Sequence, residues 1–396
     1  MNIAAETLSP PASFRQTERE KARPGTVLVF AAELLPFSET FVRDHVASLR
    51  PGSAILVGAK SVAGLSTAGL ETALLPNSRW SRLFLWLTGR SRAMDRLVEA
   101  HDVRLIHAHF ADAGARIAGY ATRRGLPLVV TLHGADVLRR PGWTTGGVIN
   151  RLLWRRMMRS TTLFLPVSDH LARKAIERGF PAAKLRRHYL GIPLERPLPN
   201  PRMAGPPTIL FIGRMVEKKG LPYLFDACAI LTRSGHDFRL RIAGDGPLLG
   251  WCHERAEPFN DSVTFLGRLP PERVREELSG ADIVCMPSVE AADGDNEGLP
   301  IVALEAQAAG VPIVAFDQGP VPECVRANET GLLAEDRSTV NLASCLSRLL
   351  ANPDLRLDLG RQGRRHVEKH FDIERQSEEL ELIYEEVLER ASGGRA

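Results

Sequence analysis

The chain has 396 residues, 44% of them hydrophobic and 25% charged, a globular composition long enough for two domains of common size. Residues 1–196 carry a net charge of +14 and the remaining residues one of −10, so we expect the two halves to meet different partners, the first of them anionic. The five cysteines are widely spaced and form no CxxC or Cys/His pattern, which argues against disulfides and structural zinc.

Residues 1–24 are rich in Pro, Glu, Arg and Ser and contain no apolar core segment. We therefore expect a disordered lead-in here and not a signal peptide. No stretch of the sequence approaches the roughly 18 uninterrupted apolar residues that a spanning helix needs. Together with the cysteine pattern, these features favour a cytoplasmic location.

From Gly25 onwards, short apolar runs alternate with longer mixed segments. The runs lie at 26–30, 54–58, 105–110, 127–134 and 162–168. Strands that alternate with helices in this way form a parallel sheet covered on both faces. The pattern predicts a first α/β domain over residues 25–193.

A proline-rich passage over residues 194–207 interrupts the pattern and is predicted to be a linker, because proline lacks an N–H and fixes φ. The alternation then restarts, which predicts a second α/β domain over residues 208–372. Its apolar runs lie at 208–214, 238–246, 263–269, 282–288 and 312–317. Residues 373–390 alternate Glu with Leu, Ile and Val at helical spacing, and this final helix is predicted to cross back to the first domain.

Ligands of open α/β sheets bind beyond the carboxyl ends of the strands, so site residues are sought after each apolar run. After the first run, Ser38, Glu39 and Thr40 resemble an N-cap cluster that opens a helix. Capping alone would explain the Ser and Thr. Their place at the end of the first strand also makes them candidates for an acceptor or phosphate loop.

His133 and Asp136 directly follow the run at 127–134, where Gly134 allows a tight turn. His133 is a candidate contact for a donor sugar or an acceptor. A single histidine is more often structural, and this is what we expect of His107 and His109.

In the second half, Gly213 ends a strand and Arg214 and Lys219 follow within one loop. Two cations placed there can clamp a diphosphate and stabilise its developing charge without a metal. The alternative is a basic surface loop, and Lys218 is expected to be a surface cation of that kind. Gly244 is predicted to lie in a strand-end turn near the nucleotide.

The strongest local feature is the acidic loop that runs into a helix after the run at 282–288. Glu297 precedes the predicted helix and can accept hydrogen bonds from sugar hydroxyls, whereas Glu305, about two turns on, can reach a ribose. Between them, Gly298, Leu299 and Pro300 lead to free N–H groups that suit a phosphate. Solvated or capping glutamates are the alternative interpretation.

These motifs together resemble glycosyltransferase family 4, whose members are retaining enzymes of the GT-B fold, over nearly all of the chain from about Thr26. The segments SETFV, HAHFAD, LHGADV and AADGDNEGLP are most similar to bacterial exopolysaccharide transferases of the colanic acid and amylovoran type. The resemblance implies two Rossmann-like domains, the first binding the acceptor and the second a nucleotide diphosphate sugar such as a UDP- or GDP-sugar. The implied acceptor is a glycan, of the lipid-linked kind extended at the inner face of the cytoplasmic membrane.

The resemblance, together with the positions of the residues after the strands, predicts roles for individual residues. The catalytic set is His133, Arg214, Lys219 and Glu297; the donor site adds Gly213, Gly244, Arg268, Gly298, Leu299, Pro300 and Glu305, and the acceptor site holds Ser38, Glu39, Thr40, His133 and Asp136. The nucleotide sugar is a co-substrate, and neither a cofactor nor a metal is expected, with Asp293 and Asp295 as the possible exception.

Segments 79–92 and 151–160 combine Trp, Leu and Phe with arginines, as interfacial helices do, although solvated arginine-rich helices are an equal alternative. We expect the first domain to rest on an anionic membrane surface. Nucleic acid is not expected, because the basic half lacks strands interleaved with aromatic residues. A nucleotide-sugar epimerase, a sugar phosphorylase and a non-catalytic sugar-nucleotide binder remain the alternative functions.

Overall fold

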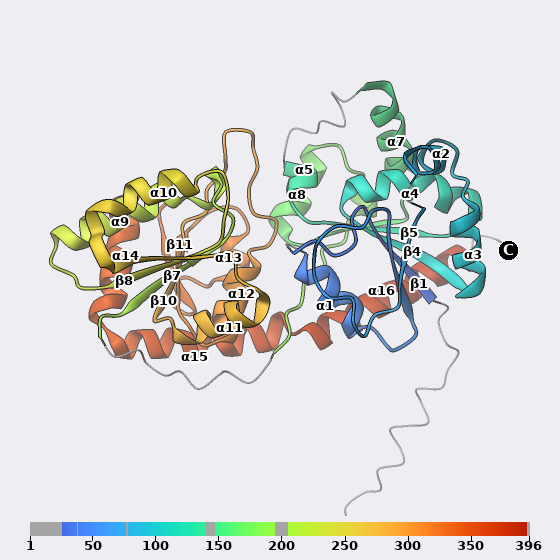
Figure 1. Ribbon diagram of the computed structural model, residues 1–396. Coiled ribbons are helices and arrows are strands. Elements are labelled where there is room, and N and C mark those ends of the chain that lie inside the picture. Colours follow the sequence, from blue (N-terminus) through green and yellow to red (C-terminus); the bar gives the residue numbers. More distant parts are fainter. Residues whose placement is uncertain (1–25, 38, 77, 139–146, 195–204, 394–396) are drawn as a thin grey trace, which may run out of the picture.

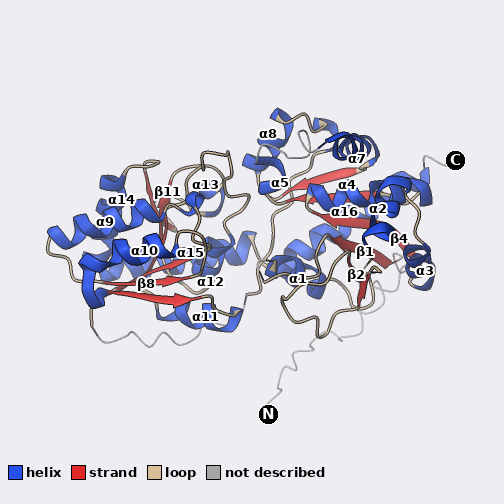
Figure 2. Cartoon of the chain, turned by 45° about the horizontal axis from the view of Figure 1, so that its top comes forward, coloured by secondary structure: helices blue, strands red, loops and turns tan. Residues whose placement is uncertain are grey.

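The computed structural model describes residues 26–37, 39–76, 78–138, 147–194 and 205–393, which form two lobes that each contain a parallel sheet (Figure 1). The predicted lead-in over 1–24 and most of the predicted linker lie outside the described residues. Both sheets are sandwiched between helices (Figure 2). Most strand positions are therefore apolar, which is why the apolar runs of the sequence located the strands.

The first sheet has the strand order β3-β2-β1-β4-β5-β6, and every pairing is parallel. Its strands are β1 (Thr26–Ala31), β2 (Ala54–Gly58), β3 (Thr72–Leu74), β4 (Val103–His109), β5 (Leu128–Leu132) and β6 (Leu163–Pro166). Its helices are α1 (Thr40–Ser48), α2 (Arg79–Thr88), α3 (Arg92–Ala100), α4 (Ala111–Arg124), α5 (Ala135–Leu138), α7 (Gly147–Ser160) and α8 (Asp169–Glu177).

The second sheet has the order β12-β11-β10-β7-β8-β9, again with parallel pairings throughout. Its strands are β7 (Thr208–Ile212), β8 (Arg239–Ala243), β9 (Val263–Gly267), β10 (Ile283–Met286), β11 (Ile313–Phe316) and β12 (Gly331–Ala334). Its helices are α9 (Leu221–Arg233), α10 (Leu249–Ala256), α11 (Pro271–Gly280), α12 (Ile301–Ala308), α13 (Val321–Cys324), α14 (Thr339–Ala351) and α15 (Pro353–His370).

Both sheets share one topology, with the chain reversing its direction of travel between β1 and β4 in the first and between β7 and β10 in the second. Ligands of doubly wound sheets bind outside the carboxyl ends of the strands at such reversal points. The prediction of two Rossmann-like sheets is confirmed. The short outer strands β3 and β12 were not predicted from the sequence.

Helix α16 (Ile373–Gly393) is the last element, and it runs from the second lobe to the first (Figure 1). Leu380, Ile383, Tyr384 and Val387 on one side of α16 join the core that includes Val29 of β1. Beside these apolar residues, Arg50 makes ion pairs with Glu381 and Glu385 of α16. The final helix therefore completes one face of the first sheet.

The segment 79–92, expected as one interfacial helix, is divided into two. Gly89 takes a left-handed conformation that ends α2, and the Ser91 side chain then accepts a hydrogen bond from the Met94 N–H to cap α3. Within the part of the chain that the structure describes, no helix is both long enough and apolar enough to cross a bilayer.

Candidate active site

The segments that follow β5, β6 and β10 meet where the two lobes touch. The Ser168 hydroxyl, after β6, donates a 2.7 Å hydrogen bond to the Gly298 carbonyl, after β10. A β-carbon on Gly298 would overlap the His133 carbonyl oxygen, and one on Gly294 would lie 3.3 Å from the Leu138 carbonyl. The carboxyl ends of the two sheets thus bring their predicted site residues together.

Glu297 is the centre of the second-domain side of this junction. Its side chain is buried, with the residue 7% exposed, and one carboxylate oxygen accepts hydrogen bonds from Lys219 Nζ at 2.7 Å and Ser288 Oγ at 2.9 Å. Burial alone would raise the pKa of Glu297, but the Lys219 and Lys218 ammonium groups hold it below its usual range. Glu297 is therefore an anion, with an acceptor oxygen available for sugar hydroxyls.

Lys218, expected as a surface cation, is largely buried instead. Its ammonium donates hydrogen bonds to Asp295 Oδ1 and to the Asn296 carbonyl oxygen, both at 3.1 Å, and 19% of its side chain is exposed. The expectation of a solvated lysine was wrong, because the acidic loop folds over the cation. Gln318 then bridges Asn296 and the Ser288 carbonyl, which fixes the loop that presents Glu297.

The predicted phosphate-binding residues lie around the end of β7. The Lys219 side chain lies close to Gly213, 3.3 Å from the position that a β-carbon there would take. Gly244 has a φ of +139° and lies against the Gly213 carbonyl, a close approach that a side chain would prevent. Arg214 is exposed, and Arg268 is an exposed partner of Asp245 at 3.6 Å, so both are accessible to a ligand.

Glu305 lies in α12, eight residues beyond Glu297. Pro300 follows Leu299 and is the N-cap residue of this helix. Burial raises the pKa of Glu305 to about 7, and the Asp44 carboxylate of α1 adds to the rise while Arg275 opposes it. The influence of Asp44 indicates that Glu305 faces the first domain. Glu305 thus changes its charge near neutral pH.

On the first-domain side, the loop after β5 presents His133. The two Asp136 carboxylate oxygens hold this loop, because they accept hydrogen bonds from the backbone N–H groups of His133, Gly134 and Ala111 at 2.8 to 3.1 Å. Burial raises the pKa of Asp136 to about 6. The Asp136 hydrogen bonds stabilise the His133 loop and the start of α4. A role of Asp136 in binding the acceptor substrate stays a prediction.

His133 lies against two aromatic rings. Neither ring was predicted from the sequence to belong to the site. Phe41 of α1 and Phe110 lie with ring centroids 4.6 Å and 4.4 Å from the imidazole. Phe110 has a φ of +71°, a strained value for a residue with a side chain and one that occurs preferentially at functional sites. Its place directly after β4 was the signal in the sequence that could have identified it.

The predicted acceptor loop follows β1. Glu39 is the N-cap residue of α1 but makes no side-chain capping bond, Thr40 is the first helical residue, and Ser38 lies outside the described residues. The cluster therefore opens a helix as expected, but Glu39 takes the N-cap position without a capping bond from its side chain. Burial raises the pKa of Glu39 to about 7, with Asp112 and Glu33 adding to the rise, so its carboxyl group titrates in the physiological range.

A residue that the sequence interpretation missed joins the two lobes. Glu323 of α13 accepts 2.7 Å hydrogen bonds from the backbone N–H groups of Asp169 and His170, at the N-terminus of α8, and a 3.2 Å bond from the Tyr189 hydroxyl. A carboxylate at a helix N-terminus is stabilised by the free N–H groups and the helix dipole. Glu323 thus caps a helix of the other domain.

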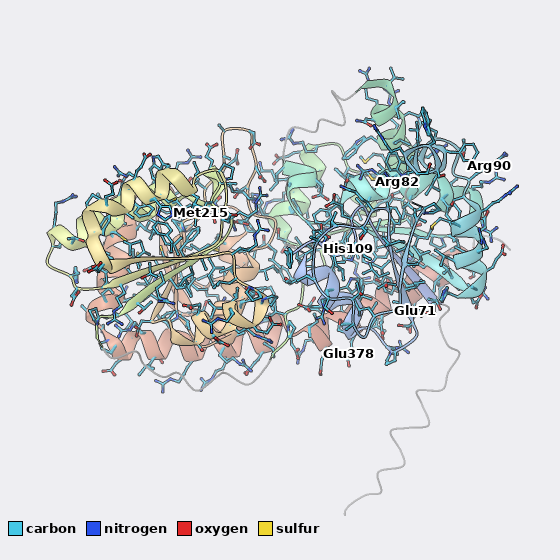
Figure 3. All side chains as sticks on the ribbon, viewed as in Figure 1. Glu71, Arg82, Arg90, His109, Met215 and Glu378 are labelled. Atoms are coloured by element: carbon cyan, nitrogen blue, oxygen red, sulfur yellow. The ribbon has the colours of Figure 1, made fainter. Side chains whose placement is uncertain are left out.

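Two groups of side chains have the chemistry of metal ligands. Asp293 and Asp295, named as a possible exception to metal independence, both have protein partners, with Asp295 paired to Lys218. His45, His107 and His109 have ring nitrogens within 4.8 Å of one another. Figure 3 shows His109 within the outline of the first lobe and Arg90 at its outer edge.

The sequence matches two known families in succession. Residues 62–196 match the family described as Glycosyltransferase Family 4, and residues 199–366 match the one described as Glycosyl transferases group 1. Together the two matches cover both sides of the junction described above.

Two curated relatives illustrate the range of the similarity. The chain is 33% identical over 249 residues to the putative colanic acid biosynthesis glycosyltransferase WcaL of Escherichia coli, a match that covers 61% of this chain and 60% of that protein. It is 32% identical over 288 residues to a GDP-mannose-dependent alpha-(1-6)-phosphatidylinositol monomannoside mannosyltransferase of Mycobacterium tuberculosis, covering 69% of this chain and 74% of that protein. The chain thus spans about three fifths of the length of WcaL.

Among solved structures, the fold resembles HepE of Anabaena in complex with UDP, with a TM-score of 0.75. The alignment covers 91% of this chain and 100% of HepE at 18% sequence identity. At that identity the likeness establishes the fold.

Proposed function

The chain belongs to glycosyltransferase family 4, and we propose that it transfers a sugar from a nucleotide diphosphate donor to a glycan acceptor with retention of configuration. The observation that carries this proposal is the buried Glu297–Lys219 pair, held against the His133 loop through Gly298. It combines an anionic acceptor for sugar hydroxyls with a cation beside the strand end where a diphosphate would bind.

We propose a UDP- or GDP-sugar as the donor, bound to the second domain. HepE is described in complex with UDP, and the mycobacterial relative is described as GDP-mannose-dependent, so relatives and neighbours use both bases. In this chain Glu305 would accept hydrogen bonds from the ribose hydroxyls and Glu297 from the sugar. Arg214, exposed at the end of β7, would face the phosphates with Lys219.

Departure of the nucleotide diphosphate leaves negative charge on the phosphate oxygens, so groups that bind this charge more tightly in the transition state accelerate transfer. Arg214, Lys219 and the free N–H groups before α12 are suited to that task. We propose that the acceptor attacks from the face that the nucleotide leaves. Glu297, already committed to Lys219 and Ser288, would bind the sugar and would not act as a glycosidase-type nucleophile.

We propose a lipid-linked oligosaccharide as the acceptor, and peripheral binding at the inner face of the cytoplasmic membrane. The support is a surface, here called the basic apolar face, formed by α2 and α7. It exposes the apolar side chains of Trp80, Phe84, Val148, Ile149 and Leu152 beside the exposed arginines Arg79, Arg151, Arg155 and Arg159.

The two helices of the basic apolar face are held together. Arg156 of α7 donates hydrogen bonds at 3.3 Å to the carbonyl oxygens of Trp86 and Leu87 in α2, and both helices pack on α4. Figure 1 shows α2 and α7 side by side at one end of the first lobe. Apolar groups ringed by arginines suit a surface of anionic lipid.

The donor proposal is tested by thermal shift with UDP-, GDP- and dTDP-sugars, followed by donor turnover with and without lipid-linked oligosaccharide. We expect one nucleotide series to stabilise the protein and turnover to require the acceptor. Conversion of the donor without an acceptor would indicate an epimerase instead. Glu297→Ala and Lys219→Ala should abolish transfer while the protein stays folded, and full activity in either variant would contradict the assignment of the site.

A further inference from the structure

His133 is connected to the interior of the first domain by hydrogen bonds between histidine rings. Its Nε2 atom lies 2.9 Å from His109 Nδ1, and His109 Nε2 lies 2.9 Å from His45 Nδ1. His109 and His45 are both buried. Each of these contacts joins two ring nitrogens, so one nitrogen must carry the proton and the other must accept it.

The chain of hydrogen bonds continues beyond His45 to the final helix and the neighbouring strand. His45 Nε2 lies 3.3 Å from the Tyr384 hydroxyl of α16, which lies 2.6 Å from His107 Nδ1. His107 Nε2 lies 2.7 Å from Thr131 Oγ1, which ends the recorded series. All of these side chains are buried.

The strand register explains why these groups meet. His107 and His109 are two residues apart on β4, and Thr131 and His133 are two apart at the end of β5, so each pair points to one face of the sheet. His109 is paired with Thr131 in the register of β4 and β5. Helices α1 and α16 cover this face and contribute His45 and Tyr384.

A neutral imidazole has one N–H and one bare nitrogen, and the Tyr384 hydroxyl has a single proton, so a series that uses this proton runs in one of only two directions. An arrangement in which Tyr384 accepts from both His45 and His107 would leave its buried hydroxyl proton with no recorded acceptor among the described residues. If Thr131 donates to His107, every later group donates onward, and His133 accepts at Nε2 and keeps its own proton on Nδ1. If Thr131 accepts from His107, the order reverses and His133 carries its proton on Nε2. In that second order the buried Thr131 hydroxyl proton has no recorded acceptor among the described residues, which is costly.

We propose that this series of hydrogen bonds fixes His133 in the tautomer protonated at Nδ1, with Thr131 and Tyr384 as positioning residues for sugar transfer. The inference rests on the proposed function, since it makes His133 a hydrogen-bond donor toward the bound sugar nucleotide. A neutral donor beside the reacting centre can stabilise oxygen atoms that gain charge as the leaving group departs. Thr131 itself takes no part in binding the ligand.

The rings stay neutral because burial lowers the pKa of each one, that of His133 to about 3, with other histidines of the series adding to the effect. A metal ion bound by His45, His107 and His109 is the competing explanation of their clustering. All six of their ring nitrogens already have hydrogen-bond partners, which favours the hydrogen-bonded series.

Nitrogen-15 NMR of the histidine rings in the full chain tests the inference without relying on activity. The His133 signals are assigned by their loss in His133→Gln. We expect the Nδ1–H tautomer in the parent and in Thr131→Ser, which keeps the hydroxyl. Thr131→Val, which keeps the shape but loses the hydroxyl proton, should populate the Nε2–H tautomer, and Tyr384→Phe should do the same by interrupting the series.

Turnover of the nucleotide sugar should follow the tautomer. Thr131→Val should lower kcat by about 2-fold for an even mixture of tautomers and up to about 100-fold for complete reversal, while Thr131→Ser keeps the parental rate. An unchanged tautomer in Thr131→Val, or equal loss in Thr131→Ser, would overturn the inference. So would stoichiometric zinc or copper in the purified parent that is lost in His45→Gln. If the parent turns over no nucleotide sugar, the proposed function fails, whereas the NMR result still decides the tautomer.

Discussion

Gly298 rests directly on the backbone carbonyl of His133, with no room between the two domains for even a methyl group. Gly298→Ala should therefore push the Glu297 loop away from the His133 loop. We expect donor turnover to fall at least about 10-fold, because displacement of catalytic groups by about 1 Å is costly. Gly250→Ala, on an open and exposed part of α10, is the matched control and should stay fully active.

The Glu297–Lys219 pair predicts non-additive effects on stability. Lys219→Met alone leaves a buried carboxylate without its main partner, and we expect a loss of about 3 kcal/mol in the free energy of unfolding. Adding Glu297→Gln removes that charge and should recover most of the loss, although all three variants should be inactive. Urea denaturation of the two single variants and the double variant measures this, and simple additivity would contradict the pairing.

Glu305 predicts a pH dependence of donor binding. Its pKa is raised to about 7 by burial and Asp44, so the carboxylate that would accept hydrogen bonds from ribose is lost as the pH falls through 7. We expect donor affinity to weaken from pH 8 to pH 6 in the parent and to change much less in Glu305→Gln. Titration calorimetry at the two pH values measures the difference.

The same shift has a consequence for stability. The folded protein holds the Glu305 proton up to a higher pH than the unfolded chain, so this group lowers the free energy of unfolding as the pH rises from about 4.5 to 7. Glu305→Gln should remove that part of the pH dependence. A steeper decline of the free energy of unfolding with rising pH in Glu305→Gln than in the parent would contradict this prediction.

The buried histidines have the opposite effect on the pH dependence of stability, because they lower the free energy of unfolding as the pH falls. Burial lowers the pKa of His107, so the unfolded chain takes up its proton first as the pH falls below about 6.5. Each such ring removes about 1.4 kcal/mol of stability per pH unit below that value. His107→Gln should therefore have a shallower loss of stability between pH 6 and pH 5, measured by urea denaturation, even if it is less stable at pH 7.

The basic apolar face predicts salt-sensitive binding to anionic vesicles. Replacing Trp80 and Phe84, which are 80% and 54% exposed, by serine should weaken sedimentation with phosphatidylglycerol vesicles several-fold. Val340→Ser, at an exposed apolar site on α14, should not. Equal binding by all variants, or binding that does not weaken in high salt, would exclude this face as the contact surface.

Much of the fold was predictable because buried parallel strands are almost wholly apolar, and the carboxyl end of each strand then indicated where chemistry occurs. β3, which has only three residues, was too short to give that signal, whereas β12 has four residues, like β10 and β11, and was overlooked. Glu297, Lys219 and His133 were selected as candidates because each lies in the segment that follows such a strand. Lys218 was misjudged because local sequence does not show which of two adjacent lysines will be covered.

The contacts that the sequence did not reveal join segments far apart in the chain. Glu323 caps α8 from more than 150 positions away, and Tyr384 meets His107 across 277 positions. No periodicity or local spacing encodes such pairs. The alternation of His107 and His109 on one strand with Thr131 and His133 on the next did carry a signal that the four side chains share a face.

Helix α16 also constrains the order in which the two domains complete their folding. The strands of the first sheet are synthesised early, but the helix that covers Val29 and its neighbours follows the whole second domain in the chain. That apolar face stays uncovered while the entire second domain is translated. During this period the exposed apolar surface makes the chain prone to aggregation. The first domain therefore completes its folding only after the second domain has been synthesised.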